Sequence, residues 1–279
     1  MSNRPESVAS IRSELNYLSE VPSEKAAVYL HVPVPENPRR GPQLQPRSTP
    51  IHDARPVRDR LSLDTEGVIL VDSPTAFSEF YDPDRVRESY FPEIEALVMR
   101  ETGAIRVVAF DHNLRSKALA KEQLHGAQMP VLFAHNDYTE ESGPQRVRDL
   151  FPDEAQELLE KRFAVINAWR PTRGPVRESP LAVCDAQTMG PDDLVAMDLI
   201  YPDRIGEIQS LRFDAGHRWL YFPEMEPSEV LLLKCFDSAT DGRARFTAHT
   251  AFDDPNTPAD VEARESIEVR TLAFFAEAR

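Results

Sequence analysis

The second half of the chain is divided into short apolar runs, and this division is the feature that most constrains the fold. The runs lie between residues 163 and 275, and Pro, Gly or Asp separates them. They read FAVINAWRP, LAVCDAQ, EIQSLRF, RWLYFP, EVLLLKCFDS, RARFTAHTAF and ESIEVRTLAFF. Short strands at this spacing are typical of a β-sandwich or a β-barrel. Helical spacing appears at residues 84–102 and 149–162, so we expect a mainly β fold with covering helices.

The first 60 residues are polar and rich in proline. Prolines recur from Pro33 to Pro50, and they exclude a helix there because proline lacks a backbone donor and fixes φ. We therefore expect residues 1–60 to form an arm packed on the body, and residues 61–279 to form a single domain.

The overall charge excludes several classes of partner. The 32 Lys and Arg residues stand against 47 Asp and Glu residues, which gives a net charge of −15. Nucleic acids and anionic membranes need a basic surface, so we expect neither as a partner. The first residues contain no apolar stretch typical of a secretion signal, and no run is long enough to span a membrane. We expect a cytoplasmic protein.

The run VLFAHNDYTEESG contains the strongest local motif. His135 and Asp137 are two residues apart at the end of the apolar run Val131–Ala134. Residues i and i+2 of a strand point to the same face, so the imidazole and the carboxylate are expected to converge. Such a pair supplies two of the three ligands of a 2-His-1-carboxylate iron site.

A third ligand has to come from elsewhere in the chain. His249 is the preferred candidate, because Arg264 and Ser266 follow it on one face of a predicted strand. A guanidinium beside a hydroxyl suits a carboxylate, which Arg binds bidentately. His217 is the rival ligand, although no such Arg-x-Ser pair directly follows it. Arg270 lies on the same strand face as Arg264 and is the alternative carboxylate partner.

Several further residues are candidates for the substrate pocket. Tyr138 follows the His135–Asp137 pair, and Asn167, Trp169 and Arg170 are expected to alternate inward along FAVINAWRP. His217 is a further candidate if it is not a ligand. The competing interpretation is a buried Trp169 beside an Arg170 that forms a structural ion pair.

The ordered set HxD, His and RxS resembles the Fe(II)/2-oxoglutarate-dependent dioxygenases. Longer blocks strengthen the likeness, namely NAWRPTRGPVRESPLAVCDAQTM, HRWLYFPEMEPSEVLLLKCFDS and TAHTAFDDPNTP. They resemble the hydroxylase/desaturase branch of microbial secondary metabolism, which includes gibberellin desaturase, aspergillic acid hydroxylase and the small component of cephamycin methoxylation. The resemblance covers roughly residues 105–275.

This resemblance implies a double-stranded β-helix, or jelly roll, as the catalytic domain over residues 61–279. It implies His135, Asp137 and His249 as Fe(II) ligands, with Arg264 and Ser266 as the site for 2-oxoglutarate. O2 is the other co-substrate, and a small secondary metabolite would be hydroxylated or desaturated while 2-oxoglutarate becomes succinate.

Two other interpretations stay open at this stage. In the first, the chain is an accessory jelly roll that acts with a partner biosynthetic enzyme. In the second, it is a Zn2+-dependent hydrolase, which would leave Arg264 and Ser266 unexplained. A homodimer is a further possibility for the assembly. The sequence does not identify the substrate, and it does not separate hydroxylation from desaturation, cyclisation or epoxidation.

Overall fold

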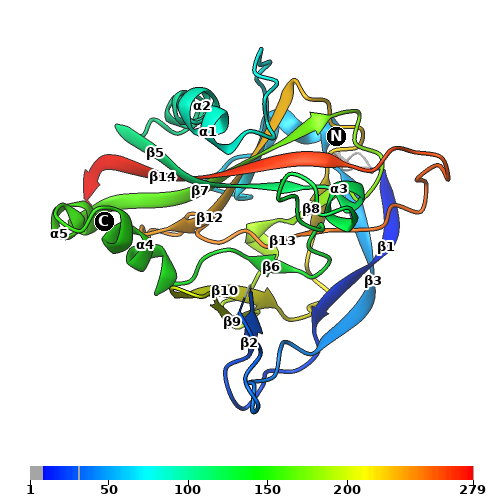
Figure 1. Ribbon diagram of the computed structural model, residues 1–279, viewed down its shortest axis with the longest axis horizontal. Coiled ribbons are helices and arrows are strands. Elements are labelled where there is room, and N and C mark those ends of the chain that lie inside the picture. Colours follow the sequence, from blue (N-terminus) through cyan, green and yellow to red (C-terminus); the bar gives the residue numbers. More distant parts are fainter. Residues whose placement is uncertain (1–8, 31, 279) are drawn as a thin grey trace, which may run out of the picture.

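Two β-sheets face each other and enclose the core, as Figure 1 shows for this computed structural model. The structure describes residues 9–30 and 32–278, so residues 1–8 of the expected arm lie outside the described residues. The strands of the larger sheet are β1 Ser10–Leu18, β2 Ala27–Tyr29, β3 Leu44–Asp53, β6 His135–Asn136, β8 Leu181–Cys184, β9 Leu194–Ile200, β10 Ile205–Leu211, β11 Trp219–Tyr221 and β13 His249–Ala251. Their spatial order is β1-β3-β11-β8-β13-β6-β10-β9-β2.

The second sheet has fewer strands and carries helices on its outer face. Its strands are β4 Val68–Asp72, β5 Arg106–Arg115, β7 Lys161–Arg173, β12 Glu229–Asp237 and β14 Glu265–Ala278, in the order β4-β12-β7-β14-β5. Neighbouring strands here are far apart in the chain and antiparallel, which is the pattern of a jelly roll. The expected mainly β jelly roll with covering helices is confirmed.

Helices pack mainly on the second sheet. They are α1 Pro83–Arg85, α2 Phe91–Thr102, α3 Lys117–Lys121, α4 Ser142–Leu150 and α5 Ala155–Glu160, with a π-helical turn η2 Val86–Tyr90 and 3-10 turns η1 Arg55–Arg60 and η3 Ala186–Thr188. The helix expected at 84–102 is present as one unbroken segment of α1, η2 and α2 that contains a π turn, with Pro92 in the first turn of α2, where its missing N–H is tolerated. The helix expected at 149–162 is divided between α4 and α5, and β7 begins at Lys161.

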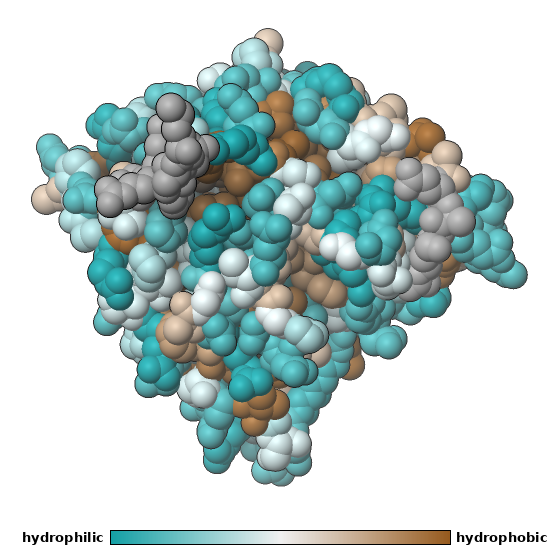
Figure 2. Space-filling model, turned by 180° about the vertical axis from the view of Figure 1, so that it is seen from behind, coloured by the Kyte–Doolittle hydropathy of each residue, from teal (hydrophilic) through white to brown (hydrophobic). Residues whose placement is uncertain are grey.

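The central strands of the second sheet are buried on both faces. On β12, Leu231 and Leu233 point into the core between the sheets, whereas Val230 and Leu232 pack with Ile94 under α2. A strand covered on both sides reads as a continuous apolar run, and EVLLLKCF is such a run. The face seen in Figure 2 is by contrast mostly hydrophilic, with hydrophobic residues in small separate groups.

Residues of the expected arm contribute strands to the larger sheet. β1 pairs with β3 along its whole length, and β3 continues the sheet through a short parallel pairing with β11. Pro46 and Pro50 lie on β3 before that pairing with β11 begins, where only β1 is a neighbour and a missing N–H costs little. The division into an arm of residues 1–60 and a domain of residues 61–279 stays a prediction.

No helix in the described part of the chain is long and apolar enough to cross a membrane.

Candidate metal centre and co-substrate site

Two neighbouring strands of the larger sheet bring His135 and His249 together. β6 and β13 are antiparallel, and these two residues are direct partners, so both side chains point to the same face. Their ring centroids are 4.5 Å apart. Asp137 follows β6, and one potential ligand atom from each of the three residues lies within 4.8 Å of the others. The sequence motif and the distal His therefore converge on one point.

Backbone carbonyls fix the orientation of both imidazoles. The Nδ1 atom of His135 lies 2.8 Å from the carbonyl oxygen of Phe133, and Nδ1 of His249 lies 3.2 Å from that of Thr247. When Nδ1–H donates to a carbonyl, the Nε2 lone pair is free for a metal. Burial, together with the neighbouring His249, lowers the pKa of His135 to about 3, so its ring is neutral at physiological pH. A neutral imidazole is the form that binds a metal ion.

Asp137 is held through only one of its carboxylate oxygens. Its Oδ2 atom accepts hydrogen bonds from Nδ2 of Asn167 at 2.9 Å and from Nε of Arg270 at 3.1 Å. Its Oδ1 atom lies 3.5 Å from Nε2 of His135 and is available to the same metal. Burial alone would raise the pKa of Asp137, but Arg270 and the two histidines outweigh burial and hold that pKa below its usual value. The carboxylate is therefore ionised, and the donor set of two imidazoles and one carboxylate suits Fe(II).

Asn136, between the two motif residues, is a positioning residue that the sequence did not reveal. Its fully buried side-chain amide donates to the carbonyl oxygens of Tyr138 and Cys235 at 2.6 and 3.0 Å, and to Oε1 of Gln209 at 3.0 Å. Its Oδ1 accepts from the backbone N–H of Thr247 at 3.2 Å. One amide thus links the turn that carries Asp137 to the segment that precedes His249. No local sequence signal marks this role, because the partners are distant in the chain.

The two candidate arginines, Arg270 on β14 and Arg264 just before it, have different surroundings. Arg270 is surrounded by carboxylates: in addition to Asp137, Glu268 lies 3.1 Å from its Nη2 atom and Asp111 lies 3.0 Å from its Nη1 atom. Its guanidinium therefore holds Asp137 and has little capacity left for a dicarboxylic acid.

Arg264 has no such partner. It is 3% exposed, its Nη1 group donates to the carbonyl oxygen of Ser179, and none of the described carboxylates lies within 4.0 Å of its guanidinium. Its buried Nε atom and the buried Oγ atom of Ser266 both lack a hydrogen-bond partner within the described structure. Buried polar atoms of this kind are normally paired, so they fit an anion that accepts from both. The residues present therefore fit 2-oxoglutarate as well as iron.

Three of the predicted pocket residues lie on the inner side of the jelly roll. Asn167 and Trp169 are on the inward face of β7, opposite Leu233 and Leu231 of β12. The ring of Trp169 lies under the guanidinium of Arg264, with 5.5 Å between Cζ and the ring centroid. Tyr138 is buried in the same inner cluster as Trp169.

The structure corrects the expectation that Arg170 points inward. Adjacent strand residues point to opposite faces, so Arg170 lies on the outer face when Trp169 lies on the inner one. There its Nη2 atom lies 3.3 Å from Oε1 of Glu93 on α2, and its guanidinium covers the ring of Tyr90. Arg170 is thus a buried structural residue between the sheet and α2.

The structure also separates His217 from the metal ligands. Trp219, two residues later, pairs with Cys184, whereas His249 pairs with Val183, and these neighbours of β8 point to opposite faces. His217 stacks on Tyr17, which accepts a hydrogen bond from Trp219, and its Nε2 atom lies 3.1 Å from Asp193. Its position is on the face of the larger sheet opposite to the one that carries His135 and His249.

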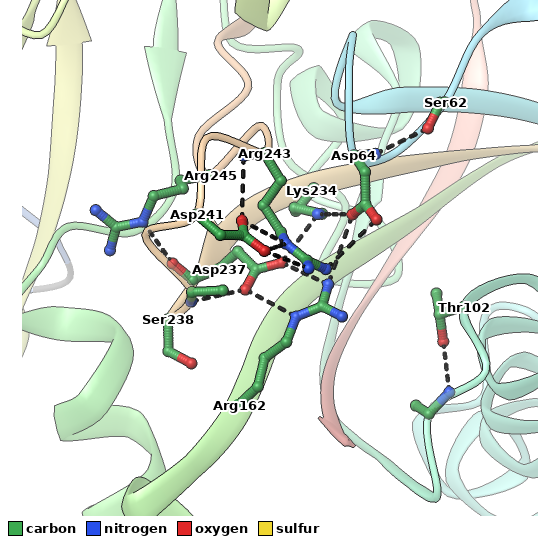
Figure 3. Close-up of polar contacts among 12 residues, drawn as sticks. Ser62, Asp64, Thr102, Arg162, Lys234, Asp237, Ser238, Asp241, Arg243 and Arg245 are labelled. Carbon is green, nitrogen blue, oxygen red and sulfur yellow. Dashed lines mark hydrogen bonds and ion pairs between the residues drawn. The ribbon is translucent and has the colours of Figure 1, made fainter. Parts of the chain in front are cut away.

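A second polar cluster, shown in Figure 3, lies outside this site and supports the loop before His249. Asp237 ends β12, is fully buried, and accepts from Arg162 at 2.8 Å and from Lys234 at 2.9 Å. Asp64 lies 2.5 Å from Lys234 and 3.4 Å from Arg243. A cavity of about 290 Å³ adjoins these residues. The charges alternate in sign, so the cluster is a compensated ion-pair network.

The jelly roll and its convergent His-Asp-His set define the class of non-haem iron oxygenases, and comparisons with known proteins agree. A family model described as an oxidoreductase/YMDC permease-like domain matches residues 15–274. The chain is 34% identical to an Fe(II)/2-oxoglutarate-dependent dioxygenase, nvfI, of Aspergillus novofumigatus over 94% of this chain and 96% of that protein. It is 32% identical to the hydroxylase/desaturase efuI of Hormonema carpetanum over 95% of each chain.

A solved structure extends this likeness to three dimensions. The iron and α-ketoglutarate-dependent endoperoxidase NvfI superposes with a TM-score of 0.84 at 30% identity, covering 97% of this chain and 99% of that one. The chain belongs to the Fe(II)/2-oxoglutarate-dependent dioxygenases, in the branch that contains hydroxylases and desaturases of secondary metabolism. It is therefore an enzyme that uses Fe(II), 2-oxoglutarate and O2 on a small-molecule substrate.

Proposed function

We propose that His135, Asp137 and His249 hold the iron, and that Arg264 and Ser266 hold the distal carboxylate of 2-oxoglutarate. The convergence of the three ligand atoms within 4.8 Å is the observation that carries the proposal. The unpaired, buried Nε of Arg264 and Oγ of Ser266 support the co-substrate position. When bound, iron supplies the oxidation of 2-oxoglutarate to succinate and the attack on a substrate C–H bond.

The protein residues around the iron orient and shield the reactants. Asn167 and Arg270 keep Oδ2 of Asp137 occupied, so Oδ1 would be the oxygen that binds iron. These three residues would hold Fe(II) through three ligand atoms, which would leave coordination positions for 2-oxoglutarate and O2. Trp169 and Tyr138 pack beside this space and keep the inner end of the site apolar.

The substrate is proposed to lie against an apolar wall beside His135. Ser210 of β10 is paired with His135, so Ile208 and its partner Met197 on β9 share the face of that imidazole. They form one cluster, and Val28, Phe133 and Leu199 pack against it. The ring of Phe133 lies 5.0 Å from the ring of His135. Such a wall suits a largely apolar small metabolite, which we propose is hydroxylated or desaturated.

Succinate release under air tests the assignment, because slow turnover of 2-oxoglutarate is measurable before the substrate is known. Purified protein with Fe(II) should release succinate from 2-oxoglutarate, and His135→Ala, Asp137→Ala and His249→Ala should abolish this release and reduce bound iron. His217→Ala is the matched control, since it removes a buried imidazole from the far face of the same sheet. This variant should retain succinate release and bound iron. Wild-type turnover in any of the three ligand variants, or loss of iron in the control alone, contradicts the assignment.

A cytoplasmic location and association with a partner biosynthetic enzyme or a second copy stay predictions from the sequence. Fractionation of source cells tests the location, and light scattering of the purified chain tests its assembly.

A further inference from the structure

Arg115 is an arginine of the inner face without a carboxylate partner. It is the last residue of β5 and is the direct partner of Ser266 on β14. Directly paired residues of antiparallel strands point to the same face, with Cβ atoms about 4.5–5.5 Å apart. Arg115 therefore projects from the edge of the second sheet toward the space in front of Ser266.

One contact orients the guanidinium of Arg115 and leaves most of its donors free. Its Nη1 group donates to the carbonyl oxygen of Met129 at 2.8 Å. Among the described residues, no carboxylate lies within 4.0 Å of it, and its Nε and Nη2 groups have no protein acceptor. The nearest acid along β14 on this face, Glu268, is bonded to Arg270 at 3.1 Å.

Arg115 and Arg264 are two cations that form no ion pair with a described carboxylate, although Glu268 is the largest charge that acts on Arg115 from a longer distance. Burial lowers the pKa of Arg264 to about 10 and the charge of Arg115 is the next largest cause, while Glu178 and Glu268 act in the opposite direction. Arg264 precedes Ser266 by two residues and Arg115 is the direct partner of Ser266, so both arginines lie beside the same hydroxyl. Both guanidinium groups stay protonated at physiological pH. Two adjacent cations in a partly desolvated site are unfavourable unless an anion lies between them.

Other arginines of the second sheet show the usual solution. Arg162 lies 2.8 Å from Asp237, Arg170 lies 3.3 Å from Glu93, and Arg270 lies 3.1 Å from Asp137. Each of these cations forms an ion pair with a protein carboxylate, whereas neither Arg115 nor Arg264 forms one among the described residues. A carboxylate from a ligand is the missing partner.

We propose that Arg115 is a second cation of the 2-oxoglutarate site and that it binds the distal carboxylate of the co-substrate together with Arg264 and Ser266. The inference rests on the proposed function, which places that carboxylate at Arg264 and Ser266. Two guanidinium groups and one hydroxyl, from the end of β5, the start of β14 and the residue before it, then bind one carboxylate. The site selects a dicarboxylic 2-oxo acid over a monocarboxylic one because removal of the distal carboxylate leaves both cations unpaired.

Calorimetric binding to the anaerobic Fe(II)-loaded protein tests this role without turnover. Two ligands are compared, 2-oxoglutarate and 2-oxopentanoate, which has the same chain length and lacks the distal carboxylate. Arg115→Gln should weaken 2-oxoglutarate by about 10- to 100-fold, as expected for a lost charged hydrogen bond, and leave 2-oxopentanoate unchanged. Arg115→Lys keeps the charge and should lose less affinity for 2-oxoglutarate than Arg115→Gln.

Two controls separate this inference from the proposed function. Arg106→Gln makes the same change at the other end of β5, where the arginine is paired with Glu154 at 2.7 Å, and it should leave both affinities unchanged. Arg264→Gln should weaken 2-oxoglutarate selectively. If Arg264→Gln weakens 2-oxoglutarate binding selectively and Arg115→Gln does not, Arg115 contacts the substrate or stabilises the fold, and the inference is wrong. An equal loss of both ligands in a folded Arg115→Gln protein also overturns the inference, since it places Arg115 at the keto-acid end. No selective loss in Arg264→Gln contradicts the proposed function itself.

Discussion

The Nε group of Arg270 donates a 3.1 Å hydrogen bond to Oδ2 of Asp137, and this contact joins the two sheets at the proposed iron site. Arg270 comes from the second sheet, and Asp137 follows β6 of the larger sheet. The contact explains how one of two similar arginines on a strand face becomes a positioning residue. The other, Arg264, keeps its donors for a ligand.

Replacement of Arg270 should weaken iron binding. Arg270→Gln removes the cation that fixes Asp137, and the loss of such an outer partner typically costs about 10- to 100-fold in metal affinity. Competition with a metal chelator measures the affinity in the absence of 2-oxoglutarate. Arg264→Gln is the matched control and should bind iron normally. If Arg270→Gln binds iron like the wild type but loses 2-oxoglutarate, the roles of the two arginines are reversed.

Replacement of Asn136 should destabilise the fold and loosen the iron site together. Asn136→Ala leaves its buried partners without hydrogen bonds, and each unpaired group costs about 1–3 kcal/mol. Urea unfolding gives the loss of stability, and chelator competition gives the loss of iron affinity. Asn256→Ala, at an exposed position, should change neither. A stable Asn136→Ala protein would show that the amide is not needed to align the two ligand segments.

The ion-pair network of Figure 3 should make a pH-dependent contribution to stability. Asp237→Asn removes one partner of a buried pair, which costs about 3–5 kcal/mol near neutral pH. Burial raises the pKa of Asp237, but Arg162 and Lys234 outweigh burial and hold it below its usual value. The stabilisation is thus fully present above the unfolded-state pKa of about 3.9 and is lost as the pH falls through the lower folded-state pKa.

Unfolding of wild type and Asp237→Asn across pH 3–7 checks this dependence. The difference in unfolding free energy between the two proteins should shrink as the pH falls below about 4. Asp241→Asn, which alters a half-exposed acid in the same loop, should have a much smaller effect at every pH. A difference that does not vary with pH would mean that Asp237 contributes through packing and not through its charge.

The hydroxyl of Tyr17 should stabilise the contact between β1 and β11. Tyr17 accepts a 2.6 Å hydrogen bond from Nε1 of Trp219, and both side chains are fully buried. Tyr17→Phe should reduce the free energy of unfolding by about 1–3 kcal/mol, because the indole N–H loses its acceptor. Tyr221→Phe is the control, since its hydroxyl has no hydrogen-bond partner among the described residues and lies in the same cluster. Equal effects of the two changes would contradict a specific role for the bond.

The sequence predicted the features that depend on local spacing. The i, i+2 spacing of His135 and Asp137 and the interrupted apolar runs indicated a strand-borne iron motif in a mainly β fold. The prediction was wrong for Arg170, because it placed Arg170 on the same face as its neighbour Trp169, whereas adjacent residues of a strand point to opposite faces. The π-helical turn before Phe91 likewise left no pattern distinct from an α-helix.

The choices among similar residues were made only by the tertiary structure. His249 and His217 are both buried histidines near strands, but only His249 faces His135, since the register of β13 and β6 makes them direct partners. Local sequence determined which residues can bind a metal or a carboxylate, because that capacity belongs to each side chain. Strand register across two sheets decided which of them meet, because convergence depends on contacts between segments more than 100 residues apart in the chain.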